Sequence, residues 1–225
     1  MHKGGWMQVA VDAVVFTIAN NDLKILLIKR KYPPYQGQYA LPGGFVLLDE
    51  NLEEAAQREL EEETGVKNIF LKQLRTYGNA KRDPRGRVIS VAYLALISAD
   101  QKLKATTDAS DARWFLLSQL PALAFDHKEI IQDSLENLRY EIQTTNISFQ
   151  ILPKKFTLTQ LQRLYEIILD KTLDKRNFRK RIRELGILKA TGEQEREGAH
   201  RPAAFYTFAS TKYQPLSEKI NVFLK

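Results

Sequence analysis

The sequence predicts an α/β (α+β) protein of two modules, the second of which is a winged helix-turn-helix. Apolar strand-like runs alternate with amphipathic helical segments over residues 1–149, and the order helix, turn, helix, hairpin follows over residues 150–225. Up to residue 153 the chain carries 18 Lys and Arg against 19 Asp and Glu, whereas the remainder carries 16 against 8. A near-neutral module therefore precedes a basic one, and the basic one is expected to face an anionic partner.

The first module opens with two apolar, β-branched runs, residues 9–18 and 23–30. The sequence Ala-Asn-Asn-Asp separates them, which is typical of a hairpin. A helical pattern then covers residues 52–64, and Gly65 stands where a helix commonly ends in a left-handed residue.

The rest of this module contains two more strand-like runs and a second helix. Residues 88–97 are apolar at both odd and even positions, which predicts a strand that is covered on both faces. Residues 111–117 are predicted to form a further strand. The second helix is expected to start at Asp126, because Asp126 and Glu129 have the spacing of a capping box.

The second module begins with the amphipathic segment KKFTLTQLQRLYEIIL, residues 154–169. A second helix is predicted from Asp174 to about Leu185. Two strand-like runs, GILKAT and RPAAFYTF, follow and are joined by a polar segment that contains Gly192 and Gly198.

Composition narrows the classes of protein and the compartment. The chain has no cysteine, which excludes a disulfide scaffold, a thiol nucleophile and a zinc site with cysteine ligands. No apolar run approaches the roughly 18 residues that a membrane span requires. We therefore expect a cytoplasmic protein without a membrane partner.

The stretch RELEEETG, residues 58–65, is either a solvated acidic helix face or a metal site. At about 100° per residue, Glu59, Glu62 and Glu63 fall within one arc of about 100°. Such a cluster is repulsive until a cation with oxygen ligands, such as Mg²⁺, is bound. Arg58 is expected to hold one carboxylate in position, and one glutamate is alternatively the base toward a metal-activated water.

The spacing around this stretch is that of a complete Nudix box: Gly44, five residues, Glu50, seven residues, then Arg58-Glu59-Leu60, Glu62-Glu63 and Gly65-Val66. Residues 8–145 therefore resemble the Nudix hydrolase superfamily. The resemblance implies a sandwich of mixed sheet between helices, dependence on Mg²⁺ or Mn²⁺, and attack of water on a substituted nucleoside diphosphate. It also assigns metal ligands and base to Glu59, Glu62 and Glu63, orientation to Arg58, a backbone contact to Gly44 and a supporting carboxylate to Glu50. Which glutamate is the base stays open.

Two later segments, GNAKRDPRGRVISVAY and LPALAFDHKEII, resemble the ADP-ribose pyrophosphatase branch. The resemblance implies arginines that meet a diphosphate or terminal ribose, with the alternative that they are solvated loop charges. His127 is interpreted as part of a helix start, with a catalytic base as the alternative. The residues expected to bind the ligand are Gly43, Gly44, Phe45, Glu50, Arg82, Arg85 and Arg87.

The second helix of the basic module has a core stripe at Phe178, Ile182 and Leu185. Most of its cations project on the opposite side, which predicts a DNA-reading face. The alternative is a merely solvated face. The residues expected to bind DNA are Lys175, Arg176, Arg179, Lys180 and Arg183, with His200 and Arg201 of the wing.

Taken together, the motifs FTLTQLQRLYE, KRNFRKRIRELGIL and RPAAFY after a Nudix domain resemble the Nudix-related transcriptional regulators of the NrtR type. This resemblance covers nearly the whole chain and implies homodimers that bind double-stranded operators of NAD metabolism genes and release them on binding ADP-ribose. Sister groups answer to pentose-derived ligands. Many such regulators have an eroded Nudix box, whereas this box is intact, so pyrophosphohydrolase activity is expected to be retained. The alternative is a housekeeping ADP-ribose pyrophosphatase whose basic domain serves dimerisation or substrate capture.

Overall fold

The computed structural model describes residues 6–98, 103, 109–195 and 202–216 of the chain. It divides into two compact units, one of Met1–Thr17 and Lys24–Leu135 and the other of Ile18–Leu23 and Glu136–Lys225. Among the described residues, no helix has the length and apolar character to cross a membrane.

The first unit is built on a mixed sheet. Strands β1 and β6 run parallel in its centre, and the order along the sheet is β3-β2-β1-β6-β5, with β4 paired to β1 and β7 paired to β2. The strands are β1 (Gln8–Ala19), β2 (Asp22–Arg30), β3 (Tyr39–Ala40), β4 (Gly43–Phe45), β5 (Lys72–Tyr77), β6 (Val88–Leu96) and β7 (Ala109–Leu116).

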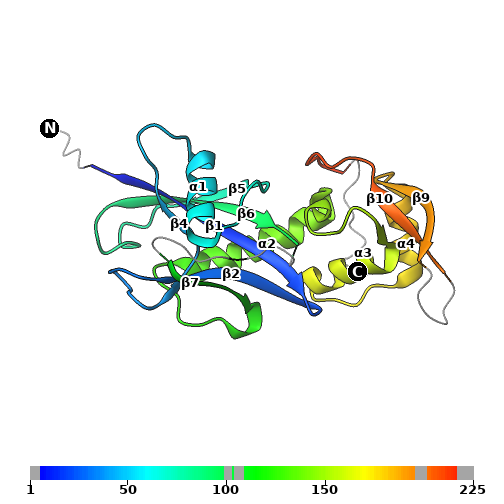
Figure 1. Ribbon diagram of the computed structural model, residues 1–225, viewed down its shortest axis with the longest axis horizontal. Coiled ribbons are helices and arrows are strands. Elements are labelled where there is room, and N and C mark those ends of the chain that lie inside the picture. Colours follow the sequence, from blue (N-terminus) through cyan, green and yellow to red (C-terminus); the bar gives the residue numbers. More distant parts are fainter. Residues whose placement is uncertain (1–5, 99–102, 104–108, 196–201, 217–225) are drawn as a thin grey trace. The chain divides into compact units, whose positions relative to one another are not determined.

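Two helices, α1 (Leu52–Thr64) and α2 (His127–Thr144), contact opposite faces of this sheet (Figure 1). Val11, Ala13 and Val15 of β1 pack in one core cluster with Ala55, Ala56 and Leu60 of α1. Side chains alternate along a strand, so Asp12 lies on the other face, where it meets His127 at the start of α2. The sandwich expected from the sequence is therefore confirmed.

Helix α1 has the limits that its sequence predicts. Asn51 accepts hydrogen bonds from the backbone of Glu53 and Glu54, and the Glu54 side chain accepts one from the Asn51 backbone. At the other end Gly65 has a φ of 74° and donates to the Glu61 carbonyl. Local capping chemistry thus fixes both ends of the helix that carries the acidic cluster.

The second unit has the order of a winged helix. It contains α3 (Leu158–Leu169), α4 (Lys175–Glu184) and a three-stranded sheet of β8 (Phe156–Thr157), β9 (Leu188–Glu195) and β10 (Ala203–Phe208). Phe178 and Ile182 are buried, and Phe178 meets Tyr165 of α3 edge to face at 5.4 Å, so the predicted core stripe of α4 is confirmed at these two positions.

Three details differ from the sequence expectations. Gly192 lies inside β9 and not in a joining segment, because a glycine at φ 80° is accommodated within the strand. Strands β3, β4, β5 and β8 were not predicted; β3, β4 and β8 are only two or three residues long and give no periodic pattern. Asp126 precedes α2 as expected, but its carboxylate accepts hydrogen bonds from Arg82 and does not cap the helix.

The units divide inside α2, after Leu135, earlier than the boundary near residue 150. The second half of this helix bonds to segments that follow it: Tyr213 donates to Glu141, and the Leu216 backbone donates to the Thr144 carbonyl. The limits 1–149 and 150–225 stay a prediction for the extent of the two domains.

Candidate functional site: a charged cavity beside the Nudix helix

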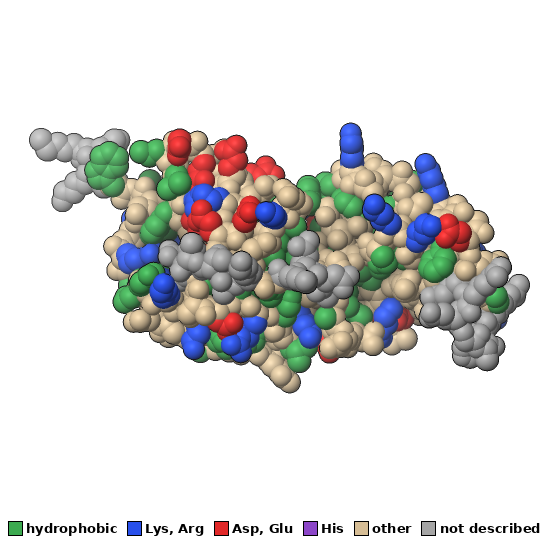
Figure 2. Space-filling view, in the orientation of Figure 1, with side chains coloured by type: hydrophobic (Ala, Val, Ile, Leu, Met, Phe, Trp, Pro, Cys, Tyr) green, Lys and Arg blue, Asp and Glu red, His purple; other side chains and the backbone are tan. Residues whose placement is uncertain are grey.

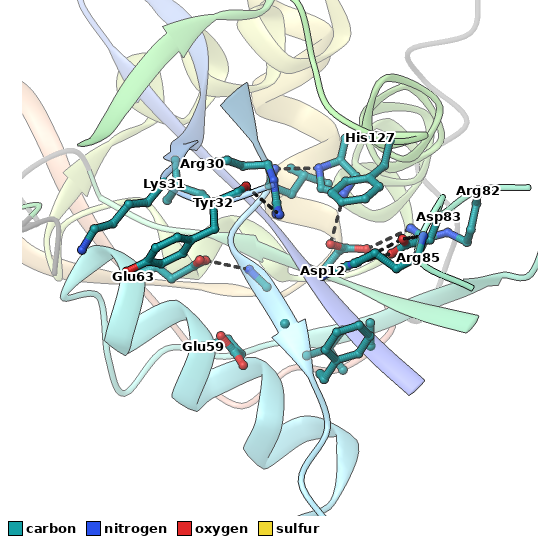
Figure 3. Close-up of a pocket in the computed structure, with 18 of the residues that line it drawn as sticks. Asp12, Arg30, Lys31, Tyr32, Glu59, Glu63, Arg82, Asp83, Arg85 and His127 are labelled. Atoms are coloured by element: carbon teal, nitrogen blue, oxygen red, sulfur yellow. Dashed lines mark hydrogen bonds and ion pairs between the residues drawn. The ribbon is translucent and has the colours of Figure 1, made fainter. Parts of the chain in front are cut away.

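A cavity of about 360 Å³ opens in the first unit, beside α1 and β4 (Figure 3). It is lined by acidic and basic side chains together with aromatic rings, so it suits a ligand that is itself charged and partly flat. Of the residues predicted from the sequence, those that line it are Gly43, Gly44, Phe45, Glu59, Glu63, Arg82 and Arg85.

The two glycines of LPGGF lie in close contact with other parts of the cavity wall. A Cβ on Gly44 would collide with the Glu59 carboxylate, and a Cβ on Gly43 would collide with the Val11 carbonyl. The Gly43 amide also donates to Glu63 Oε2 at 2.9 Å. The backbone of β4 and two Nudix-box carboxylates thus form one wall of the cavity.

Arg58 bonds to three carboxylates of the Nudix box, although it does not itself line the cavity. Its guanidinium donates to Glu50 at 2.8 and 2.6 Å, to Glu59 at 2.8 Å and to Glu62 at 3.3 Å, and also to the Phe45 carbonyl at 3.2 Å. The hydrogen bond from Arg58 lowers the pKa of Glu50 to about 2. The orienting role expected for Arg58 is consistent with this geometry.

The three glutamates of the predicted metal site have different surroundings. Burial raises the pKa of Glu59, and the hydrogen bond from Arg58 opposes this effect. Glu63 is buried beside Gly43. The Glu62 side chain is 48% exposed and does not line the cavity. Within the described residues, no group of three His, Cys, Asp or Glu side chains is arranged to hold a metal ion. The oxygen donors suit a hard divalent cation, but Arg58 bonds to two of the three carboxylates in this conformation.

A buried polar network lies at the α2 side of the cavity. Arg82 donates to both oxygens of Asp126 at 2.8 and 2.7 Å and to Asp12 at 3.4 Å, and Ser90 also donates to Asp12. Burial opposes the charge of Arg82, but the hydrogen bonds to Asp126 and the charge of Asp12 raise its pKa overall. Arg82 is therefore a buried, neutralised cation and not a solvated loop charge.

His127 belongs to the same network and has a defined protonation state. Its Nδ1 accepts from the Leu41 amide at 2.8 Å, and its Nε2 lies 3.3 Å from Asp12 Oδ1. Burial lowers the pKa of His127, so the imidazole is neutral and carries its proton on Nε2. His127 begins α2 as expected, and it also lines the cavity.

The other two predicted arginines differ from each other. Arg85 lines the cavity, donates to both oxygens of Asp83 at 3.0 and 2.7 Å, and stacks over Phe45 and Phe125 at 4.7 and 5.5 Å. Arg87 is exposed, donates to the Gly78 carbonyl at 2.6 Å and does not line the cavity.

Several lining residues were not among the sequence predictions. One signal that could have indicated these lining residues is Asp12 within an apolar strand, because an ionised side chain in a buried strand needs partners. Arg30 and Lys31 at the end of β2 are another, since strand ends commonly border binding sites. The charged and aromatic lining residues that sequence reasoning missed are Asp12, Arg30, Lys31, Tyr32, Asp83 and Phe125.

Helix α4 in the second unit presents the cations predicted to meet DNA. Lys175, Arg176 and Arg183 are exposed and form no ion pair within the described residues, whereas Lys180 lies 4.0 Å from Glu184. Arg179 is half-buried and donates to Thr159 of α3 at 3.2 Å. His200 and Arg201 lie outside the described residues.

Figure 2 shows acidic side chains gathered over α1 of the first unit, while Lys and Arg side chains predominate on the visible face of the second. A Nudix-like catalytic fold and a winged helix in one chain define a class of proteins: DNA-binding regulators built on a nucleotide hydrolase.

Comparisons with known proteins agree with this class. Residues 8–134 match the model of the NUDIX domain, and residues 148–208 match that of the NrtR DNA-binding winged helix domain. The chain is 40% identical over 207 residues to the "ADPR responsive transcriptional repressor NtrR" of Acinetobacter baylyi, covering 90% of this chain and 82% of the relative.

Two further relatives match one or both units. The NrtR of Shewanella oneidensis, solved with a 27mer DNA, is 35% identical with a TM-score of 0.77 over 89% of this chain and 93% of that one. Its NUDIX domain, solved with ADP ribose, is 40% identical with a TM-score of 0.57 over 60% and 90%. The ADP-ribose pyrophosphatase of Methanocaldococcus jannaschii is 48% identical over 125 residues, 56% of this chain and 71% of the relative. The chain belongs to the NrtR family of Nudix-related transcriptional regulators.

Proposed function

We propose that this protein is a cytoplasmic, homodimeric transcriptional repressor that binds double-stranded operator DNA through α4 and releases it on binding ADP-ribose in the Nudix cavity. The observation that carries the proposal is that one chain holds both a charged cavity beside a complete Nudix box and, in a winged helix, a helix with exposed cations that form no ion pair with any described residue. The Acinetobacter baylyi and Shewanella oneidensis relatives support this choice of ligand and of partner.

Recognition of DNA is expected to combine phosphate contacts with one or two base contacts. Lys175, Arg176 and Arg183 have no competing carboxylate in the described residues, so their charge is available to the phosphate backbone. An arginine at the exposed face of the second helix is also suited to bind guanine with two hydrogen bonds.

We further propose that the protein retains Mg²⁺- or Mn²⁺-dependent hydrolysis of ADP-ribose to AMP and ribose 5-phosphate. The Nudix and ADP-ribose pyrophosphatase matches support a potential for hydrolysis, and the Nudix family generally uses divalent metals. Glu59, Glu62 and Glu63 would hold the cation, which would supply charge neutralisation and an activated water. Arg58 would position these carboxylates, and Gly43 and Gly44 would let the ligand approach β4.

The second candidate is a housekeeping ADP-ribose pyrophosphatase with an accessory basic domain. The intact box and the relative from Methanocaldococcus jannaschii favour it. It predicts hydrolysis without specific DNA binding, whereas the repressor requires both DNA binding and its loss with ligand.

The test is a panel of ADP-ribose, NAD and pentose phosphates, scored both for hydrolysis and for release of DNA selected from a random pool by the full-length protein. A repressor should lose DNA affinity about 5- to 150-fold at saturating ADP-ribose, the usual range of coupling between two sites. Specific DNA binding that no ligand changes would reject the proposed regulation. Failure to enrich any DNA sequence would favour the pyrophosphatase.

A further inference from the structure

Three arginines line the cavity, and two of them are already neutralised. Arg82 makes two charged hydrogen bonds to Asp126 and one to Asp12, and Arg85 makes a paired interaction with Asp83. A guanidinium whose donors are engaged by carboxylates offers little net charge to a ligand. These two residues fix the shape of the cavity more than they attract an anion.

The third arginine, Arg30 at the end of β2, has a different set of partners. Its Nε donates to the Pro34 carbonyl at 2.8 Å, and its Nη2 donates to the Tyr32 carbonyl at 3.5 Å. It forms no ion pair with a carboxylate in the described part of the chain, and its Nη1 has no hydrogen bond there. Arg30 is half-buried and remains charged, because guanidinium does not lose its proton in proteins.

The guanidinium of Arg30 also lies over an aromatic ring. It lies 4.9 Å from the centre of the Phe125 ring, and Arg85 lies 5.5 Å from the same ring centre. Burial and the neighbouring charge of Arg85 lower the pKa of Arg30 more than Glu63, Asp83 and Asp12 raise it, which means that its charge is held at a cost. An incoming anion relieves this cost, whereas a second cation increases it.

We propose that Arg30 is the residue that binds the phosphate groups of the ligand, and that Arg82 and Arg85, although expected from the sequence, act by positioning. Figure 3 shows Arg30 at the wall of the cavity, together with Tyr32 and His127. This inference rests on the proposed function, because ADP-ribose is the diphosphate that the cavity is expected to hold. For any diphosphate bound in this cavity, Arg30 is the lining arginine whose charge is not already paired with a carboxylate of the described residues.

The test compares Arg30→Gln with Arg30→Lys and with Arg139→Gln as a matched control. Arg139 is also a half-buried arginine that donates to a backbone carbonyl, that of Ile168, but it does not line the cavity. Binding of ADP-ribose and of inorganic pyrophosphate is measured by calorimetry with the full-length protein at several salt concentrations. Divalent metals are chelated so that no hydrolysis takes place, and thermal unfolding is recorded for each variant.

Arg30→Gln should weaken the affinity for ADP-ribose about 10- to 100-fold, the loss expected for hydrogen bonds to a charged group, and should reduce the salt dependence of binding. Arg30→Lys should lose less than the glutamine variant, because the charge remains. The affinity of Arg139→Gln for ADP-ribose should stay within about twofold of wild type.

Two results would overturn the assignment. One is an Arg30→Gln protein with wild-type affinity. The other is equal damage by lysine and glutamine with unchanged salt dependence, since that pattern would mean that Arg30 only anchors the loop through Pro34 and Tyr32. Wild-type binding of pyrophosphate without binding of ADP-ribose would reject the proposed ligand and leave the Arg30 comparison valid with pyrophosphate. Wild-type binding of neither probe would reject both.

Discussion

Replacing Arg82 by methionine should destabilise the first unit severely, although the residue lies in a loop. The Arg82 side chain is 4% exposed, and its partners Asp126 and Asp12 are 16% and 9% exposed. Methionine removes the guanidinium but keeps much of the apolar stem, so the change leaves the buried Asp12 and the partly buried Asp126 without their cation. Breaking a buried pair in this way costs about 3–5 kcal/mol.

This loss can be assigned to the first unit by its fluorescence. The chain has two tryptophans, of which Trp6 is fully exposed and Trp114 packs against the core cluster shared by β1 and α1. The fluorescence change on unfolding in urea therefore reports the first unit, and its midpoint should fall for Arg82→Met. In a thermal scan the same loss corresponds to about 10–20 °C for a unit of this size.

A double-mutant cycle separates the ion pair from the loss of packing. Asp126→Asn alone leaves Arg82 with Asp12, and the double variant removes both partners of the shortest contact. The two losses should be non-additive by about 1–3 kcal/mol. Arg87→Gln is the control and should stay within about 0.5 kcal/mol of wild type. Additive losses, or an Arg82→Met protein as stable as the control, would refute the assignment of Arg82 to a buried structural pair.

Three further predictions concern catalysis, DNA and pH. With Mg²⁺, Glu63→Gln should lower the rate of ADP-ribose hydrolysis by ~10²-fold. The control Glu61→Gln, on the exposed side of α1, should hydrolyse ADP-ribose at the wild-type rate. Equal rates in the two variants would argue against Glu63 as a metal ligand or base. Arg183→Ala should weaken DNA binding by ~1–3 kcal/mol in an anisotropy titration, whereas Arg181→Ala, paired with Glu184, should change it less. The first unit should lose stability as pH falls from about 6.5 toward 5, because His127 takes up a proton more readily in the unfolded chain than in the folded one. The urea midpoint of wild type should therefore fall over this pH range, and that of His127→Asn should not. The charged groups that act on this imidazole are Asp12, Asp126, Arg82 and Arg30.

The elements of the fold were predictable wherever local chemistry sets their limits. Helix α1 begins at an asparagine cap and ends at a left-handed glycine, and both signals lie within the helix's own few residues. Helix α4 likewise starts after Asp174, whose side chain accepts from the Asn177 amide. Such signals act over three or four residues and need no knowledge of the tertiary structure.

The cavity was predictable only in part, because its charges meet over long sequence separations. Asp12 and Arg82 are 70 residues apart, Arg82 and Asp126 are 44 apart, and Leu41 and His127 are 86 apart. No pattern along the chain tells which arginine a distant aspartate will neutralise. The pairing of Arg85 with Asp83 is different, since only Pro84 separates them and the loop sequence Asp-Pro-Arg already offers it.

A complete Nudix box affects whether a repressor of this family responds to the amount of its ligand or to the rate at which the ligand is produced. Ligand shifts a protein between two conformations only through its different affinity for them, and only while it is bound intact. AMP and ribose 5-phosphate, once separated, lose the advantage of being linked, because each fragment must bind alone at its own concentration. If hydrolysis is retained, bound ADP-ribose has a lifetime set by Glu59, Glu62 and Glu63, and DNA is released for as long as supply exceeds that turnover. The proposed protein would then respond to the rate at which ADP-ribose is produced, whereas a relative with an eroded box would respond to the amount present.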